Sequence, residues 1–363
     1  MRTLLIQPHD PVIFRDGKPF NEGALHAKSL PFPLPATIAG AIRTRARADW
    51  DFRDQTHIDR IRAIRHTGPF LVVQNEQGRW ELALPAPADV VITEEDNILR
   101  AHPLRPKQLD PLEGFLSPFG FDQPVGVTPL MGAPGVKPAA KLPPFWRWDR
   151  MSQWLAGSQL TGVLTRGTLG YIALPEQKRI HVAIDPATQT AAEGMLFATH
   201  GLEFVRRGIL SRVEESEDAS WPAVAPIGGE RRLAFWSELG EEEFTWPSMP
   251  SLPKGSTTIR LVLATPAAFD GGWYPAWARD ELVPGFADVK LKLVAAAVPR
   301  FQPVSGWDLQ IDKAKATRFL APAGSVYFFN VKEGDPSKLW LKSISDREQD
   351  RNDGFGIALV GAA

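Results

Sequence analysis

The residues best placed for chemistry in this sequence are cations that flank glycines and turns. The segment HDPVIFRDGKPF, residues 9–20, sets Arg15 and Lys18 on either side of Asp16-Gly17. Gly17 accepts a positive φ at little cost, so the pattern predicts a tight turn that carries two cations. Such a turn could hold phosphate oxygens, whereas a charged turn is also common on an ordinary solvated surface.

A second basic group lies on a predicted helix over residues 36–50, ATIAGAIRTRARADW. Its apolar residues recur at helical spacing, and Pro35 and Thr37 are good start signals. Arg43 and Arg47 are four residues apart, which places them on one helix face. They could bind phosphates, helped by backbone N–H groups at the helix N-terminus near Thr37. A solvated helix face is an equally good interpretation of this stretch alone.

Two later segments also combine cations with glycine or aromatic residues. In GGERRLAFW, Gly229 permits a ligand to approach the backbone closely, and Glu230 could orient an arginine such as Arg231. A turn with a surface salt bridge is the alternative. In the last third, Trp307 could stack a base, although a core position is the more ordinary one for tryptophan. Basic residues that could follow a nucleic-acid backbone alternate toward a strand there: Lys313, Lys315 and Arg318.

The closing segment GFGIALVG holds Gly354 and Gly356. It does not follow a strand and open a helix, as the glycine loop of a dinucleotide or phosphate site does. Kinase, dehydrogenase and NTPase interpretations therefore lose support.

The positions of the histidines give little indication of a catalytic or metal-binding site. The seven histidines show no metal-ligand spacing, and the absence of cysteine excludes thiolate sites and disulfides. His9-Asp10 resembles the dipeptide of metal-dependent phosphohydrolases, but the other ligands are missing. His26, beside Lys28 in a loop with glycine, is the candidate for acid–base cleavage of RNA. Such short motifs are weak evidence, so the non-catalytic interpretation is favoured. We expect no metal and no cofactor.

Composition limits the class of protein. The 363 residues fit about two domains at ~150 residues each, and the 33 prolines indicate long shaped loops and few long helices. The formal net charge is −1, so any nucleic-acid site must be local. No stretch approaches the ~20 apolar residues of a membrane span, and the N-terminal apolar run is too short for a signal peptide. We expect a cytoplasmic protein with no membrane contact.

The pattern of the chain predicts two α+β halves. The expected domains cover residues 1–240, with insertions, and 251–363, with an acidic, proline-rich and serine-rich segment between them. Both halves open with a strand followed by a long loop, which favours two copies of one unit. Other expected features are a hairpin at 69–73 and 80–84, mostly loop over 85–149, and strands near 179–185, 194–205, 231–236, 257–266, 289–298, 324–331 and the C-terminus.

Several ordered motifs together resemble one family. QPHDPVIFRDGKPF, LPFPLPATIAGAIRT, GGERRLA, PVSGWDL, APAGSVYFF and GFGIALVG are similar to motifs of the third Cmr subunit of type III-B CRISPR effector complexes. That subunit belongs to the RAMP (repeat-associated mysterious protein) superfamily. The resemblance runs from near residue 5 to near residue 361 and is weakest over about 85–175.

The resemblance implies two ferredoxin-like, RRM-like RAMP domains and a role in antiviral defence. It implies a non-catalytic RNA-binding subunit that holds the 5′ tag of the crRNA. It also implies a bridge between the large polymerase-like subunit and the backbone RAMP subunits. The motif positions carried over are Arg15, Gly17, Lys18, Thr37, Arg43, Gly229, Glu230, Arg231, Gly354 and Gly356, and helix geometry adds Arg47.

Two other functions stay open at this point. Some RAMP relatives are metal-independent endoribonucleases that process CRISPR RNA, and His26 with Lys28 would then be the reacting pair. The near-neutral charge also permits a scaffold that binds protein alone.

Overall fold

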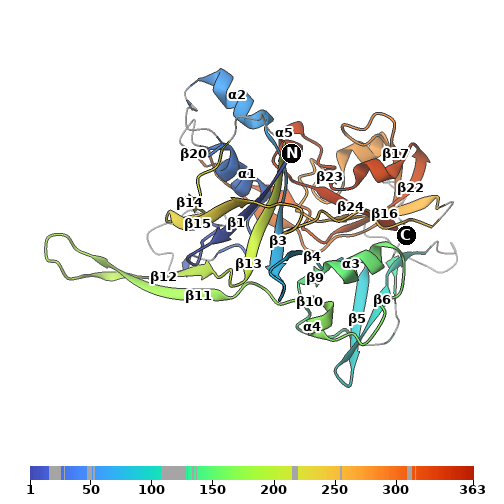
Figure 1. The fold of residues 1–363 in the computed structure, drawn as a ribbon, viewed down its shortest axis with the longest axis horizontal. Coiled ribbons are helices and arrows are strands. Elements are labelled where there is room, and N and C mark those ends of the chain that lie inside the picture. The colour runs from blue at the N-terminus through green and yellow to red at the C-terminus, as the bar shows by residue number, and fades with distance from the viewer. Residues whose placement is uncertain are drawn as a thin grey trace.

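The structure is a computed structural model that describes residues 1–15, 26–27, 29–46, 51, 54–107, 128, 130–132, 135, 137–214, 220–253, 256–308, 313–314 and 316–363. It is a mixed α/β protein in which antiparallel sheets predominate and the helices are few and short (Figure 1). The expected α+β class is confirmed at this level, while its ferredoxin-like form stays a prediction.

The larger sheet has eight strands, and each neighbouring pair is antiparallel. Its order is β10 (Gly170–Tyr171), β9 (Phe145–Arg147), β4 (Trp80–Pro85), β3 (Arg65–Gln74), β13 (Arg207–Glu214), β1 (Arg2–Pro8), β15 (Arg232–Glu238) and β14 (Val224–Ile227). Leu4, Leu5 and Ile6 of β1 are all buried, because both faces of this strand are covered. The predicted hairpin around Asn75 is confirmed by the register of β3 and β4.

The smaller sheet has five antiparallel strands from the last third of the chain. Its order is β17 (Lys290–Ala297), β22 (Val326–Glu333), β16 (Thr258–Leu263), β24 (Ile357–Ala362) and β23 (Lys342–Ser343). The four strands β17-β22-β16-β24 follow the same chain order as β3-β13-β1-β15 of the larger sheet, namely second, third, first and fourth. The two halves therefore share a strand arrangement.

The two sheets pack against a common apolar core. Phe70 and Leu82 of the larger sheet belong to the same buried cluster as Val262 and Phe328 of the smaller one. The helix α3 (Trp148–Leu155) contributes Trp154 to this cluster and contacts both β4 and β24. Burial of this continuous apolar surface is the main force that holds the halves together. The division at residues 240 and 251 stays a prediction.

The helix predicted over residues 36–50 is shorter than expected. The helix α1 covers Pro35–Arg43, begins with proline at its first position and buries Ile38 and Ile42. The Thr44 hydroxyl donates to the carbonyl of Gly40, which competes with continuation of the helix. Other helical segments are α2 (Gln55–Ala63), α4 (Arg166–Leu169), η2 (Ala276–Arg279), η3 (Pro336–Leu339) and α5 (Glu348–Asn352). In the described part of the chain, no helix is long and apolar enough to cross a membrane.

Small sheets extend from this body. A long hairpin of β11 (Glu176–Ile184) and β12 (Ala191–Leu202) projects to the left in Figure 1, and β2 (His26–Ala27) pairs with β12 in parallel. The other pairs are β5 (Val90–Glu95) with β6 (Ile98–Pro103), β7 (Arg105–Pro106) with β8 (Leu130–Met131), β18 (Gln302–Val304) with β21 (Arg318–Leu320), and β19 (Trp307–Asp308) with β20 (Lys313–Ala314). The expectation of mostly loop over 85–149 is wrong at the β5–β6 hairpin.

Candidate nucleic-acid interface

The short segment Val12–Arg15 is fixed by main-chain bonds to two distant parts of the chain. Val12 exchanges backbone hydrogen bonds of 3.0 and 2.8 Å with Leu202, at the end of β12. The amide of Gly229 donates to the carbonyl of Ile13 at 2.8 Å. Val12, Ile13 and Phe14 are buried, whereas Arg15 is exposed. The apolar residues therefore anchor a strand whose last residue presents a cation to solvent.

A tight connection between β14 and β15 lies directly beside this segment. Gly228 has a φ of +67°, and a Cβ there would stand 2.7 Å from the Ile13 carbonyl oxygen. Glu230 and Arg231 also have positive φ, at 60° and 53°. At Gly229, a Cβ would lie 3.7 Å from the Arg15 Nε. Glycine is needed at this connection because it must pass close to the Ile13–Arg15 backbone.

This geometry brings two predicted cations into one small region, which we call the Arg15–Arg231 turn site and define by Arg15, Gly229, Glu230 and Arg231. Arg231 is exposed and makes no hydrogen bond or ion pair with the residues that the structure describes. Glu230 accepts from Arg232 at 2.8 Å, so its carboxylate orients that arginine and not Arg231. The turn site therefore presents cationic groups with one carboxylate among them.

Other predicted residues lie near this turn site or outside the described part of the chain. Ser29 pairs with Arg15 and its hydroxyl accepts from the Phe14 amide at 2.9 Å, while the His26 backbone pairs with Ala198 of β12. Thr37 is exposed in the first turn of α1. Predicted residues that lie outside the described residues are Gly17, Lys18, Lys28, Arg47 and Lys315; for His26 and Lys313 only the backbone is described.

Arg43 has a position that its spacing did not predict. Only 6% of this residue is exposed. Its guanidinium donates to the Ile64 carbonyl at 2.6 Å and to the Asn352 carbonyl at 2.9 Å, and it pairs with Asp353. The helix α1 ends at Arg43, and Arg47, the other arginine expected on the same helix face, lies outside the described residues. The geometry makes Arg43 a link between α1 and the C-terminal segment, and it does not offer the side chain to a phosphate.

Three more predicted residues meet at the same junction. Arg318 makes a bidentate pair with Asp350, at 2.8 and 2.7 Å, and lies over the Phe355 ring. Gly354 has a φ of +84°, and a Cβ there would stand 2.4 Å from the Gly68 carbonyl oxygen of β3. Gly356 has a φ of +69° and packs against Ser345. Gly354 is needed for close packing against β3 of the larger sheet, whereas Gly356 is needed for packing within the C-terminal half.

The junction also encloses a neutral histidine. His66 of β3 is 2% exposed, and its ring contacts Ser211 Oγ at 2.8 Å and the Asp353 carbonyl at 3.2 Å. Burial lowers the pKa of His66 to about 3, and the neighbouring Arg43 guanidinium acts in the same direction. We define this Arg43–Asp353 junction by Arg43, His66, Arg318, Asp353 and Gly354.

Comparison with known proteins decides the family. Residues 4–363 match the family described as CRISPR-associated protein (Cas_Cmr3). The chain belongs to this family. The match confirms the resemblance to the third Cmr subunit that the ordered sequence motifs indicated. None of the curated proteins compared with the chain matches it.

Two solved structures that are similar to this chain contain Cmr complexes. One matching chain is from a cryo-EM structure of the Type III-B Cmr-beta bound to cognate target RNA and AMPPnP, at 16% identity and a TM-score of 0.49. Another is from the Type III-B Cmr-beta bound to cognate target RNA, at 17% identity and a TM-score of 0.49. Each match covers 90% of this chain and 86% of the other.

This Cas_Cmr3 chain also contains a buried ion pair that the sequence analysis missed. Arg260 of β16 and Asp89 are both fully buried and paired, and the Trp154 indole donates to Asp89 at 2.8 Å. The Arg260 guanidinium lies 5.0 Å over the Trp154 ring. Burial lowers the pKa of Arg260, and Asp89 opposes this shift. An arginine inside the apolar stretch TTIRLVLATP was the available signal, because a buried charge requires a partner.

The β11–β12 hairpin is a second feature with an exposed surface. Along one face of β11, Ile180, Val182 and Ile184 are 65%, 44% and 54% exposed. A two-stranded hairpin is only marginally stable in water unless something covers its apolar face. Among the described residues there is no group of three His, Asp or Glu that could hold a metal ion.

Proposed function

We propose that this chain is a non-catalytic, RNA-binding subunit of a type III-B Cmr effector complex. In this proposal it holds the 5′ tag of the crRNA at the Arg15–Arg231 turn site. It also bridges the large polymerase-like subunit to the backbone RAMP subunits. Two ferredoxin-like RAMP domains form its body, and the strand order common to both sheets supports that assignment.

The observation that carries the proposal is the convergence of Arg15 and Arg231 from two hydrogen-bonded neighbouring segments. Their backbones are joined through Ile13 and Gly229, although the two segments are more than 200 positions apart in the chain. Cations carried by a hydrogen-bonded backbone suit a single-stranded RNA end, because phosphate contacts position the RNA while base contacts specify its sequence. A local site also agrees with the net charge of −1 for the whole chain.

The bridging role is supported by the β11–β12 hairpin. Its exposed apolar residues extend from the base at Leu202, which contacts Val12 beside the turn site. A contiguous group of exposed apolar residues often marks a surface that binds another protein. The hairpin thus connects an apolar protein-facing surface to the region where the RNA end would lie.

A metal-free titration of the full chain tests this proposal. The probe is labelled crRNA with its 5′ tag, compared with the same RNA after the tag is scrambled. We expect tighter binding of the tagged RNA and no cleavage. The double variant Arg15→Gln/Arg231→Gln should lose this binding, whereas Arg60→Gln/Arg62→Gln, which removes two exposed arginines from α2, should keep it.

Each other outcome identifies a different function. Cleavage that disappears in His26→Ala would make the chain a processing endoribonuclease. No RNA affinity, together with tight association to the other Cmr subunits, would make it a protein scaffold. Equal loss in both double variants would place the RNA elsewhere on the surface.

A further inference from the structure

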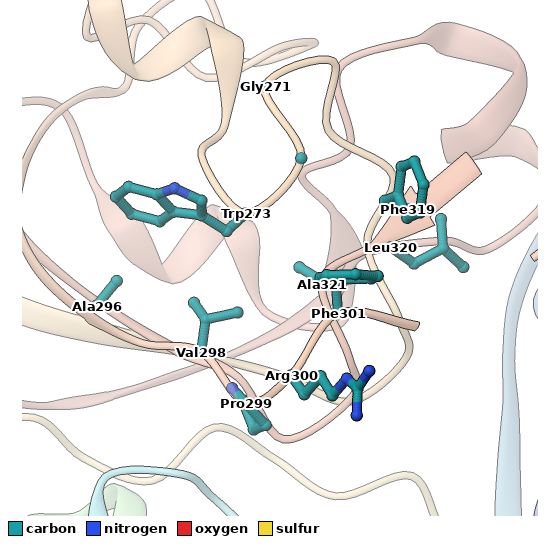
Figure 2. A pocket seen from close by; sticks show the side chains of 11 residues that line it. Gly271, Trp273, Ala296, Val298, Pro299, Arg300, Phe301, Phe319, Leu320 and Ala321 are labelled. Carbon is teal, nitrogen blue, oxygen red and sulfur yellow. The ribbon is translucent and has the colours of Figure 1, made fainter. Parts of the chain in front are cut away.

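An apolar pocket opens on the C-terminal half, at the base of the β18–β21 pair. It has a cavity volume of about 480 Å³. Figure 2 shows Trp273, Val298, Phe301 and Phe319 around this hollow, with Arg300 below Phe301 in the view. Leu320 and Ala321 are buried beside it. A pocket of this size accommodates a small planar group, since ligand sites in proteins commonly measure about 300–1,000 Å³.

Two phenyl rings at the rim are unusually exposed for their size. Phe301 and Phe319 are 51% and 52% exposed, and their rings meet edge to face with centroids 5.0 Å apart. Phe319 is the cross-strand partner of Pro303, so the pairing of β18 with β21 holds it in place. An edge-to-face pair leaves one ring face open, and a flat aromatic group can stack on that face.

The charge at the rim restricts the chemistry of the occupant. Arg300 is exposed, and no other residue in the described ranges forms a hydrogen bond or ion pair with its guanidinium. An apolar side chain from a protein would leave this cation unmatched. A nucleotide matches both parts of the pocket, because its base is planar and its phosphate is an anion.

We propose that this pocket binds one unpaired RNA base, stacked on the Phe301–Phe319 pair, with the adjoining phosphate at Arg300. The proposal rests on the proposed function, because it takes RNA as the partner of this chain. It adds a second contact on the C-terminal half, separate from the Arg15–Arg231 turn site. Stacking accepts any base, so this contact adds affinity without reading the sequence of the tag.

The test is RNA binding by the full chain with three substitutions at one ring. Phe319→Ala should weaken binding of tagged crRNA about 5- to 100-fold, because stacking is lost. Phe319→Leu should weaken it nearly as much, since leucine keeps apolar bulk but has no ring face, whereas Phe319→Trp should retain affinity. Leu282→Ala, 40% exposed at the opposite end of β17, is the control and should bind as wild type.

Two further measurements identify the bound nucleotide. Abasic replacement at each RNA position in turn should reveal one position where wild type and Phe319→Ala bind equally. Arg300→Gln should make the negative slope of log affinity against log salt concentration shallower by about 0.7, while Phe319→Ala leaves that slope unchanged. Wild-type binding by Phe319→Leu with loss of Cmr subunit association would assign the pocket to protein and overturn the proposal.

The test of the base pocket and the test of tag recognition can fail separately. If tagged and scrambled RNA bind equally and Phe319→Ala weakens both, tag recognition fails and the base pocket stands. If the tag is preferred and Phe319→Ala binds like wild type, the base pocket fails and tag recognition stands.

Discussion

Arginines that look alike in the sequence have opposite environments in the Arg15–Arg231 turn site and the Arg43–Asp353 junction. Arg231 is exposed on a turn and has no partner among the described residues. Arg43 is buried, bonded to two carbonyls and paired with Asp353. Both lie within three residues of a glycine, at Gly40 and Gly229. The comparison shows that an arginine in a basic motif can be buried in packing between the two halves or lie exposed on a turn.

The largest expected effect is the loss of stability when Arg43 is removed. Arg43→Gln removes the cationic partner of the Asp353 carboxylate, which keeps only the Gln349 amide as a side-chain donor, and it leaves two carbonyls without the arginine. This should lower the free energy of unfolding by about 3–5 kcal/mol. Urea unfolding at pH 7 measures this change, with Arg62→Gln as the exposed control. A stable Arg43→Gln chain that loses RNA binding would erase the difference between the two regions.

The buried His66 should make stability depend on pH. Its pKa is about 3 when folded and ordinarily 6.5, so between these values the unfolded chain binds more protons. Stability from this group is therefore complete above pH 6.5 and is lost as the pH falls. At pH 5 the loss is about 2 kcal/mol. Urea unfolding from pH 7 to 5 measures it. In the His66→Gln variant, the free energy of unfolding should fall less between pH 7 and pH 5 than in the wild type. An equal fall in both proteins would show that His66 can take up a proton in the folded state.

Removal of the exposed Arg231 should leave the fold intact and weaken RNA binding. Arg231→Gln should alter the free energy of unfolding by no more than about 0.5 kcal/mol. Affinity for tagged RNA should fall about 5-fold, and the negative slope of log affinity against log salt concentration should become shallower by about 0.7. Fluorescence anisotropy at several salt concentrations gives both values. An unchanged salt slope would remove Arg231 from the RNA contact.

The smallest expected effect comes from the carboxylate at the turn site. Glu230→Gln removes the negative charge that pairs with Arg232 and repels phosphate. RNA affinity at low salt should rise about 2-fold, and the gain should disappear at high salt because exposed charges are screened. Weaker binding would mean that Glu230 positions the arginines more than it repels the RNA.

Much of the fold was predictable from local pattern. The hairpin around Asn75, the strand TTIRLVLATP and the closing strand occur where alternation or apolar runs placed them. The β5–β6 hairpin was missed because VVITEEDNILR alternates weakly and its turn at Asp96-Asn97 contains no glycine. For the candidate site, the glycines at 229 and 354 were identified, but their different roles were not.

The sequence by itself determined the absence of cysteine chemistry and the positions of many strands along the chain, because each depends on composition or on residues close together. It also determined the family, because the ordered motifs that carry the resemblance can be recognised one by one without the fold. Only the tertiary structure decided which arginines remain available. Arg43 meets Asp353 across 310 positions, and Arg260 meets Asp89 across 171. Burial and pairing of a charge depend on groups that folding brings together, so the spacing of arginines along the chain cannot distinguish a ligand contact from an internal ion pair.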